Sequence, residues 1–187
     1  MARRILDAAP DKFALAGVSM GGMVALELMK IAPSRVTRLA LVDTNARPDS
    51  VTRKVSRFVA NLVVGLNGDF RPLAKRSIPS LVHPVTSDDV NAEIIDMSLR
   101  VGAPTYIRQN RAVRIHGDLR AVLPGIGVPT AVIVGRVDVL LPLEMSEEIH
   151  RLTPASTLHI IPDCGHLPPI EKPHAVADLL RKLMLQG

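Results

Sequence analysis

Serine, histidine and aspartate together carry out acyl transfer in many enzymes, and this sequence places Ser19, Asp138 and His166 just beyond predicted strands. A serine hydroxyl is a poor nucleophile near neutral pH, so an imidazole must accept its proton during attack and later return it to the leaving group. A carboxylate must hold that imidazole in the right tautomer and stabilise its charged form. Ser19 is therefore the candidate nucleophile, His166 the candidate base and Asp138 the candidate orienting acid.

Ser19 lies in the glycine-rich string Gly-Val-Ser-Met-Gly-Gly, which spans residues 17–22. An apolar run at residues 13–16 precedes the string, and apolar residues at helical spacing follow it over residues 20–31. This order predicts a short strand, a tight turn and a helix. A glycine-rich turn without chemistry is the alternative, but the matching acid and histidine downstream favour a turn that presents a nucleophile.

Backbone geometry explains why glycines surround Ser19. In such a turn the serine has a strained backbone conformation, and we expect Gly17 and Gly21 to prevent collisions between Cβ atoms. Gly22 is expected to let the first helical turn lie close against its strand. The N-terminus of that helix points free N–H groups toward the serine, so the Met20 N–H is the predicted oxyanion donor.

The acid and the histidine follow two later strands. The predicted strand at residues 130–134 leads into Gly-Arg-Val-Asp, which ends at Asp138. The predicted strand at residues 157–161 leads into Pro-Asp-Cys-Gly-His, which ends at His166. Ligand chemistry gathers beyond the carboxyl ends of parallel strands, so both side chains are expected at one edge of the sheet. Asp43 closes another predicted strand and is the alternative acid.

Other residues with reactive or titratable side chains are interpreted as structural. Asp163 is predicted to be a turn residue. Cys164, the single cysteine, excludes an internal disulfide and is interpreted as a small packing residue. The remaining histidines are interpreted as polar surface groups: His83, His116, His150, His159 and His174.

The predicted elements alternate between strand and helix on both sides of a helical middle segment. Four strands joined by helical crossovers predict an α/β fold with a parallel sheet and right-handed connections. The core is expected to comprise residues 1–45 and 126–187. The predicted elements are helix 2–9, strand 13–16, helix 20–31, strand 36–42, strand 130–134, helix 143–152, strand 157–161 and helix 173–185.

The middle segment, residues 46–125, is predicted to be an inserted helical lid. Val55, Phe58 and Leu62 recur there at helical spacing, and prolines interrupt the pattern. The segment also carries the whole net charge of +5, with twelve Lys and Arg against seven Asp and Glu. This excess is interpreted as a solvated helical surface, with attraction of anionic substrates as the alternative.

Composition excludes several classes of protein. The chain of 187 residues contains three Phe, one Tyr and no Trp, so it lacks the aromatic platforms of single-strand nucleic-acid binders. No apolar run reaches membrane-spanning length, and no signal-peptide pattern opens the sequence. We expect a cytoplasmic protein with neither a nucleic-acid partner nor a membrane partner.

Three motifs carry a resemblance to a known family: Gly-Val-Ser-Met-Gly-Gly, Gly-Arg-Val-Asp and Asp-Cys-Gly-His-Leu-Pro-Pro-Ile-Glu-Lys-Pro. They resemble the α/β-hydrolase superfamily, near its small esterases, enol-lactonases and cofactor-free haloperoxidase-like members, and the chain order serine, aspartate, histidine is the order of that superfamily. The resemblance implies a serine hydrolase of small carboxylic esters or lactones that forms an acyl-enzyme on Ser19 and needs no cofactor or metal. A perhydrolase, in which peroxide replaces water as acyl acceptor, is an alternative that uses the same residues.

Members of this superfamily resemble one another in an eight-stranded sheet whose fifth strand precedes the nucleophile, and this chain matches only the last four strands. The resemblance then implies that the loop supplying a second oxyanion donor is absent, which leaves Met20 and weakens catalysis about a hundredfold or more. The strand at residues 13–16 is also expected to expose an unpaired edge, which predicts a homodimer formed across it. The remaining alternative is a catalytically impaired scaffold that serves as a binding or assembly module.

Overall fold

The computed structural model describes residues 1–185 and places a parallel four-stranded sheet in the order β1-β2-β3-β4 at the centre of the core. All neighbouring strands are parallel, so each connection crosses from one end of the sheet to the other. The predicted α/β fold class is confirmed. The strands are β1 (Phe13–Val18), β2 (Val36–Val42), β3 (Thr130–Gly135) and β4 (Ser156–Ile161).

The strands differ in burial according to their place in the sheet. All six residues of β3, Thr-Ala-Val-Ile-Val-Gly, are buried, since a central parallel strand is covered on both faces and β-branched side chains pack well there. Strand β1 lies at one edge, and its first four residues alternate between half-buried and exposed. Among the described residues β1 pairs with β2 alone.

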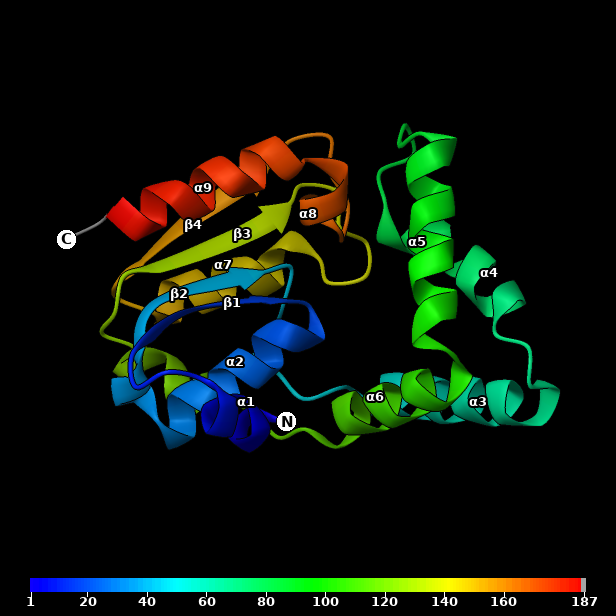
Figure 1. Ribbon diagram of the computed structural model, residues 1–187, viewed down its shortest axis with the longest axis horizontal. Coiled ribbons are helices and arrows are strands. Elements are labelled where there is room, and N and C mark those ends of the chain that lie inside the picture. Colours follow the sequence, from blue (N-terminus) through cyan, green and yellow to red (C-terminus); the bar gives the residue numbers. More distant parts are fainter. Residues whose placement is uncertain (186–187) are drawn as a thin grey trace.

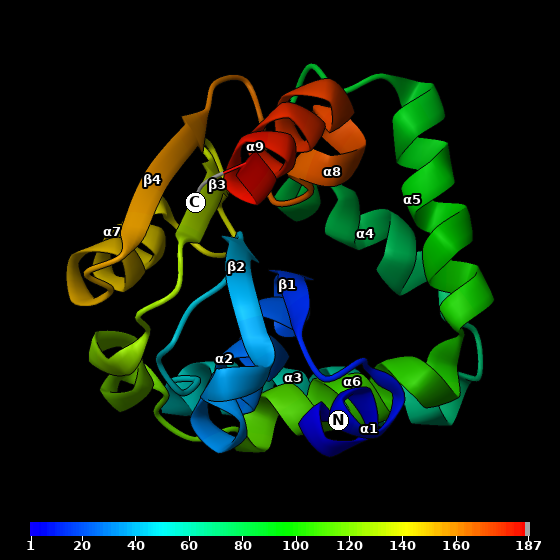
Figure 2. The same ribbon diagram turned by 60° about the vertical axis from the view of Figure 1, so that its left-hand side comes forward.

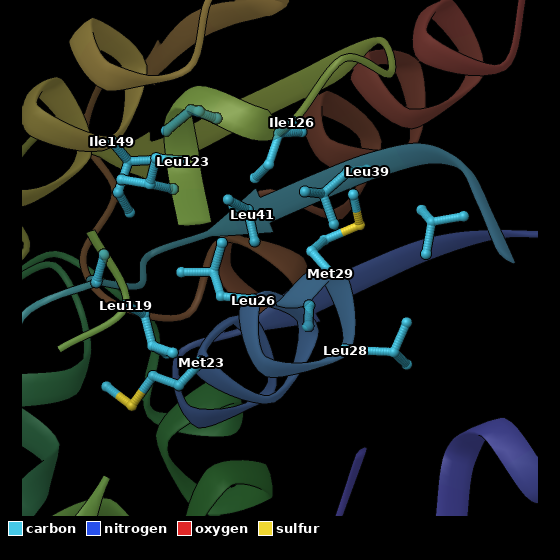
Figure 3. Close-up of a cluster of buried hydrophobic side chains, with 14 of the residues drawn as sticks. Met23, Leu26, Leu28, Met29, Leu39, Leu41, Leu119, Leu123, Ile126 and Ile149 are labelled. Carbon is cyan, nitrogen blue, oxygen red and sulfur yellow. The ribbon is translucent and has the colours of Figure 1, made fainter. Parts of the chain in front are cut away.

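Alternation along β2 sends neighbouring side chains into two separate cores. Leu41 packs in one cluster with Leu26 of helix α2 and Ile149 of helix α7, as Figure 3 shows. The next residue, Val42, packs in a second cluster with Val176 of helix α9. Helices α2 and α7 therefore cover one face of the sheet, and α9 covers the other (Figure 1). The core helices are α1 (Ala2–Ala8), α2 (Met20–Ile31), α7 (Leu143–Leu152), α8 (Pro168–Glu171) and α9 (Pro173–Leu185), with short 3₁₀ turns η1 (Pro33–Arg35) and η2 (Arg120–Gly125).

Four helices between β2 and β3 form an arm beside the sheet, which we call the lid arm (Figures 1 and 2). Helix α3 packs on α6, and α4 packs on α5. The arm begins and ends at one place, because the Leu119 N–H donates to the Ala46 carbonyl at 2.8 Å. No helix within residues 1–185 is both long and apolar enough to cross a membrane. The arm helices are α3 (Val51–Asn67), α4 (Arg71–Leu81), α5 (Asp88–Val101) and α6 (Ala103–Ile115).

Helix α3 has clear ends but an unusual distribution of apolar residues. The Ser50 hydroxyl caps its start by accepting from the Arg53 N–H, and Gly68 ends it in a left-handed conformation at φ 68°. The predicted helical spacing of Val55, Phe58 and Leu62 is confirmed, yet each of these side chains is at least half exposed on the outer face. The inward face of α3 is therefore formed by other residues.

Candidate active site

Ser19 lies at the turn between β1 and α2, in the strained conformation that the sequence predicts. Its φ and ψ are 51° and −115°, a region that residues with a Cβ atom rarely adopt. Two contacts with the end of β2 hold it there. The Ser19 N–H donates to the Val42 carbonyl at 2.8 Å, and the Thr44 hydroxyl donates to the Ser19 carbonyl at 2.7 Å.

The glycines around Ser19 have unequal roles. A Cβ atom on Gly17 would lie 2.4 Å from the Gly21 carbonyl carbon, so the strand and helix meet only because Gly17 lacks a side chain. A Cβ atom on Gly22 would lie 2.5 Å from the Thr44 side chain. Gly22 therefore allows close packing of α2 against the loop after β2, and not against the preceding strand as expected. The expectation for Gly21 is wrong, because a Cβ atom there would meet nothing within 4 Å.

The structure brings Ser19, His166 and Asp138 into one hydrogen-bonded chain. Ser19 Oγ lies 2.8 Å from His166 Nε2, and His166 Nδ1 lies 2.7 Å from Asp138 Oδ2. Asp138 Oδ1 accepts from the backbone N–H groups of Leu140 and Leu141 at 2.8 and 2.9 Å. With Nδ1–H donating to the carboxylate, Nε2 presents its lone pair to the serine hydroxyl, which is the arrangement that proton removal requires.

Met20 is the first residue of α2, directly after the serine. The N–H groups of the first helical turn have no acceptor within the helix. Two later N–H groups of the turn, those of Gly22 and Met23, donate to the Ser19 carbonyl at 3.0 and 3.3 Å. The Met20 N–H belongs to the first residue of α2 and therefore lies at the positive end of the helix dipole, as expected of an oxyanion donor.

Two glycines bring His166 close to the end of β3. A Cβ atom on Gly135 would lie 1.9 Å from the Gly165 carbonyl oxygen, and one on Gly165 would lie 2.7 Å from the Val82 backbone. The His166 N–H donates to the Leu81 carbonyl at the end of α4, at 2.9 Å. The histidine loop is therefore wedged between the sheet and the lid arm.

Glu171, for which no role was predicted from the sequence, also joins the histidine loop to the lid arm. Its carboxylate accepts from the Gly165 N–H at 3.0 Å and the Leu167 N–H at 3.2 Å, on either side of the histidine. It also accepts from the His83 N–H at 2.7 Å and the Thr86 hydroxyl at 3.0 Å, in the loop between α4 and α5. Glu171 belongs to the Pro-Pro-Ile-Glu-Lys-Pro segment of the third motif, which was the one sequence clue to it.

Asp43, the alternative acid, lies next to the chain of three residues but does not bond to the histidine. Its Oδ1 atom accepts from the Gly135 N–H at 3.0 Å, and its buried Oδ2 atom has no hydrogen-bond partner among the described residues. Burial away from water, aided by the neighbouring Asp138 carboxylate and opposed by the Gly135 hydrogen bond, raises the pKa of Asp43 to about 9. Asp43 is therefore a neutral acid at neutral pH.

Asp43 also forms, with Asp138 and His166, a cluster of side chains of the types that bind metal ions. Asp43, Asp138 and His166 each place one ligand-type atom within 4.8 Å of the others. Both ring nitrogens of His166 and both oxygens of Asp138 are already hydrogen-bonded within the protein, however. Their hydrogen bonding fits a proton-transfer site better than a cation site.

The residues interpreted as structural fall into two groups. Asp163 lies in the turn after β4 with a positive φ of 48°, and Cys164 is buried in the core beneath α9, as predicted. Burial raises the pKa of the Cys164 thiol, so it stays protonated. The expectation for the other histidines is only partly right: His174 is exposed, but the remaining four are half-buried because they lie in loops and elements that pack against neighbours, namely His83, His116, His150 and His159.

A cavity of about 190 Å³ opens beside Ser19, between the sheet and the lid arm. Its apolar wall consists of Met20, Met23, Val113, Leu140 and Leu141. Its polar lining comes from the serine and from arm residues, namely Ser19, Arg57, Tyr106, Gln109 and Asn110. A larger hollow of about 460 Å³ under α1 shares part of the apolar wall, but Ser19 does not line it, so the smaller cavity is the candidate substrate pocket.

Comparison with known proteins agrees with this fold and site. The family model described as the alpha/beta hydrolase family matches residues 2–179. The chain is 28% identical to the pimeloyl-[acyl-carrier protein] methyl ester esterase of Aromatoleum aromaticum, over 96% of this chain and 77% of that protein. A thermophilic esterase from Thermogutta terrifontis superposes with a TM-score of 0.88 at 33% identity, over 93% of this chain and 65% of that one. The enol-lactonase from Burkholderia xenovorans shares the fold at a TM-score of 0.82 and 24% identity, over 98% of this chain and 69% of that one.

This chain belongs to the alpha/beta hydrolase family. The resemblance drawn from its three motifs is confirmed, and the predicted enzyme class, a serine hydrolase, agrees with the family. The chain spans 65% of the thermophilic esterase and 77% of the methyl ester esterase. What those longer proteins do therefore bears on this chain as a proposal.

Proposed function

We propose that this chain is a serine hydrolase that cleaves small carboxylic esters or lactones through an acyl-enzyme. The observation that carries the proposal is the continuous chain of hydrogen bonds from Ser19 Oγ through the imidazole of His166 to Asp138, at 2.8 and 2.7 Å. Because the three groups already touch, no rearrangement is needed before proton transfer.

The reaction follows from the positions of these atoms. Ser19 Oγ attacks the carbonyl carbon of the ester while His166 Nε2 takes the hydroxyl proton, and Asp138 stabilises the resulting imidazolium. The carbonyl oxygen becomes an oxyanion beside the Met20 N–H. The carbon–oxygen bond to the alcohol then breaks, His166 returns the proton to the departing alkoxide, and the acyl group remains on Ser19. Water attacks the acyl-enzyme in the same way, with His166 again taking and returning a proton, and the free acid leaves.

The size of the cavity and the relatives favour small ester substrates. A volume of about 190 Å³ is below the usual range for drug-sized ligands, so it suits a short acyl chain with a small alcohol. The named reaction of the Aromatoleum relative is cleavage of a methyl ester, and methanol is the smallest alcohol that an ester can release. We therefore favour methyl and other short-chain esters.

Turnover of p-nitrophenyl acetate and of methyl butyrate tests the proposal, with Ser19→Ala as the control. We expect measurable turnover by the original protein and a fall of at least about a thousandfold in the variant, whose circular dichroism spectrum is unchanged. Equal rates for the two proteins would remove Ser19 from the mechanism. A folded chain without any turnover would contradict the proposal and favour the binding or assembly scaffold.

We also propose that the chain forms a homodimer across the free edge of β1. Two apolar hollows, of about 230 and 380 Å³, flank Leu15 and Ala16 on this strand. Unpaired strand edges with apolar surroundings seek partners. Size-exclusion chromatography with light scattering at micromolar concentration is expected to report twice the mass of the chain, and a stable monomer would contradict the dimer.

A further inference from the structure

A positively charged side chain lines the pocket beside Ser19, on the side of the lid arm. Among the described residues that line it, Arg57 of α3 is the only one with a charged side chain. The opposite wall is apolar, from Met20 and Met23 of α2 to Leu140 and Leu141 after β3. A substrate whose ester lies at Ser19 would therefore have an aliphatic part along the wall and its other end near Arg57.

Helix α3 turns its polar side inward to place this arginine. Arg57 and Asn61 lie on the inward face, one turn apart, while Phe58 and Leu62 are about half exposed on the outer face. Val64 is also buried on this helix, but around Arg57 the usual amphipathic pattern, in which the apolar face packs inward, is reversed. Burying a polar face costs free energy unless its groups are hydrogen-bonded, so Arg57 and Asn61 need hydrogen-bond partners on the inward side of the helix.

Those partners exist and hold the guanidinium group from one side. Arg57 Nε donates to Asp49 Oδ2 at 2.6 Å, and Nη1 donates to Asn110 Oδ1 at 2.8 Å. The Asn110 amide in turn donates to the Arg57 carbonyl at 3.0 Å and to Asn61 Oδ1 at 2.8 Å. Within the described part of the chain, Nη2 of Arg57 has no partner.

The exposed end of this pair is the cation and not the carboxylate. The Asp49 side chain is 2% exposed, whereas the Arg57 side chain is 28% exposed. One turn earlier on α3, Arg53 donates from Nη2 to the carbonyl of Leu140, which lines the pocket. Because the Asp49 carboxylate is buried while the Arg57 guanidinium lines the cavity, positive charge is directed toward the cavity.

We propose that Arg57 is a specificity-determining residue that binds a carboxylate at the far end of the substrate. The proposal rests on the proposed ester hydrolysis and narrows its substrates to half-esters of short dicarboxylic acids. A guanidinium held by Asp49 and Asn110 keeps its remaining N–H groups in place, so little freedom is lost when a carboxylate accepts from them. The apolar wall contacts the methylene groups between carboxylate and ester.

The test compares monomethyl glutarate, which carries a free carboxylate at pH 7.5, with dimethyl glutarate, which does not. We expect the original protein to prefer the half-ester. Arg57→Met is expected to lose about tenfold or more in kcat/KM on the half-ester, chiefly through KM. On the neutral diester, kcat/KM of the same variant is expected to change by no more than about threefold, because this substrate has no carboxylate for Arg57 to bind. Equal losses on both esters, or no preference in the original protein, would overturn the proposal.

Two controls separate this role from lid stability and from total charge. Arg57→Lys keeps the positive charge and is expected to recover part of the preference for the half-ester. Arg108→Gln removes an exposed arginine of α6 and is expected to change neither rate. Calorimetric binding of glutarate extends the test to a chain that turns over neither ester. Binding that Arg57→Met abolishes would then support the carboxylate site and contradict only ester hydrolysis, while absence of binding would overturn the site itself.

Discussion

His166 Nε2 lies 2.8 Å from Ser19 Oγ, although 147 residues separate the two in the chain and their strands lie at opposite edges of the sheet. The histidine loop must therefore reach back across the end of β3 to meet the serine. Gly135, which ends β3, permits this path because the Gly165 carbonyl occupies the space that its side chain would fill. The contact on which the chemistry depends is thus set by backbone packing as much as by the three side chains.

Removing the acid is expected to reduce catalysis without unfolding the chain. Asp138→Asn keeps the size of the side chain but favours the wrong tautomer of His166, so kcat is expected to fall about 10⁴-fold. Steady-state kinetics on p-nitrophenyl acetate, with circular dichroism for the fold, measures this. A variant with nearly full activity would show that Asp43 or another acid orients the histidine.

Substitutions of Gly17 and Gly21, on either side of Ser19, are expected to change stability in opposite directions. Gly17→Ala places a Cβ atom 2.4 Å from backbone and is expected to lower the free energy of unfolding by about 3 kcal/mol or more. Gly21→Ala adds a methyl group to open space within a helix and is expected to raise that free energy by up to about 1 kcal/mol. Urea unfolding of the two variants decides this, and equal destabilisation would contradict the packing described for the turn.

Glu171 is expected to position His166 rather than to touch the substrate. All five of its partners are donors, four of them N–H or O–H groups and the fifth the weak S–H donor of Cys164. In Glu171→Gln the amide nitrogen would replace one of the two carboxylate oxygens and would face donors there. We expect kcat to fall about tenfold to a hundredfold through displacement of the histidine, with KM little changed. Glu144→Gln, at an exposed position in the first turn of α7, is the matched control. A Glu171→Gln variant with normal kcat but lower stability would limit Glu171 to a structural role.

Asp43 is expected to make the protein less stable as pH rises. Its pKa is about 9 in the folded chain, raised mainly by burial from an ordinary value of 3.8. Between these two values the unfolded chain binds fewer protons than the folded one, so its contribution to stability is complete below about pH 4 and is lost progressively up to about pH 9. Asp43→Asn, which retains an acceptor for the Gly135 N–H, is expected to flatten this slope. Urea midpoints at pH 5, 7 and 9 measure it, and identical slopes for both proteins would contradict a neutral Asp43.

The sheet and the meeting of its loops were predictable because both depend on local patterns. Apolar runs mark the four strands. Because the strands are parallel, the loops that carry Asp138 and His166 must lie at the same edge of the sheet as the turn of Ser19. The chemistry of these residue types then limits what they can do together. The sequence predicts this much without knowledge of any long-range contact.

The supporting contacts were not predictable, because their partners lie far apart in the chain. Glu171 meets His83 and Thr86 across 88 and 85 residues, and no periodicity links them. The hydrophobic periodicity of α3 also predicts the wrong face as buried, since amphipathic packing would place Phe58 inside and Arg57 outside. The role expected of Gly21 assumed a symmetric turn, but the path of α2 brings only Gly17 and Gly22 into contact with other segments.

Covalent labelling tests the central claim most directly. The protein is treated with a fluorophosphonate, which forms a stable bond only with a serine whose proton a base removes, and the adduct is located by peptide mass spectrometry. We predict a single adduct on Ser19 that is absent from Ser19→Ala and strongly reduced in His166→Ala. Unlabelled Ser19 in the folded protein, or equal labelling of the original protein and His166→Ala, would contradict the account.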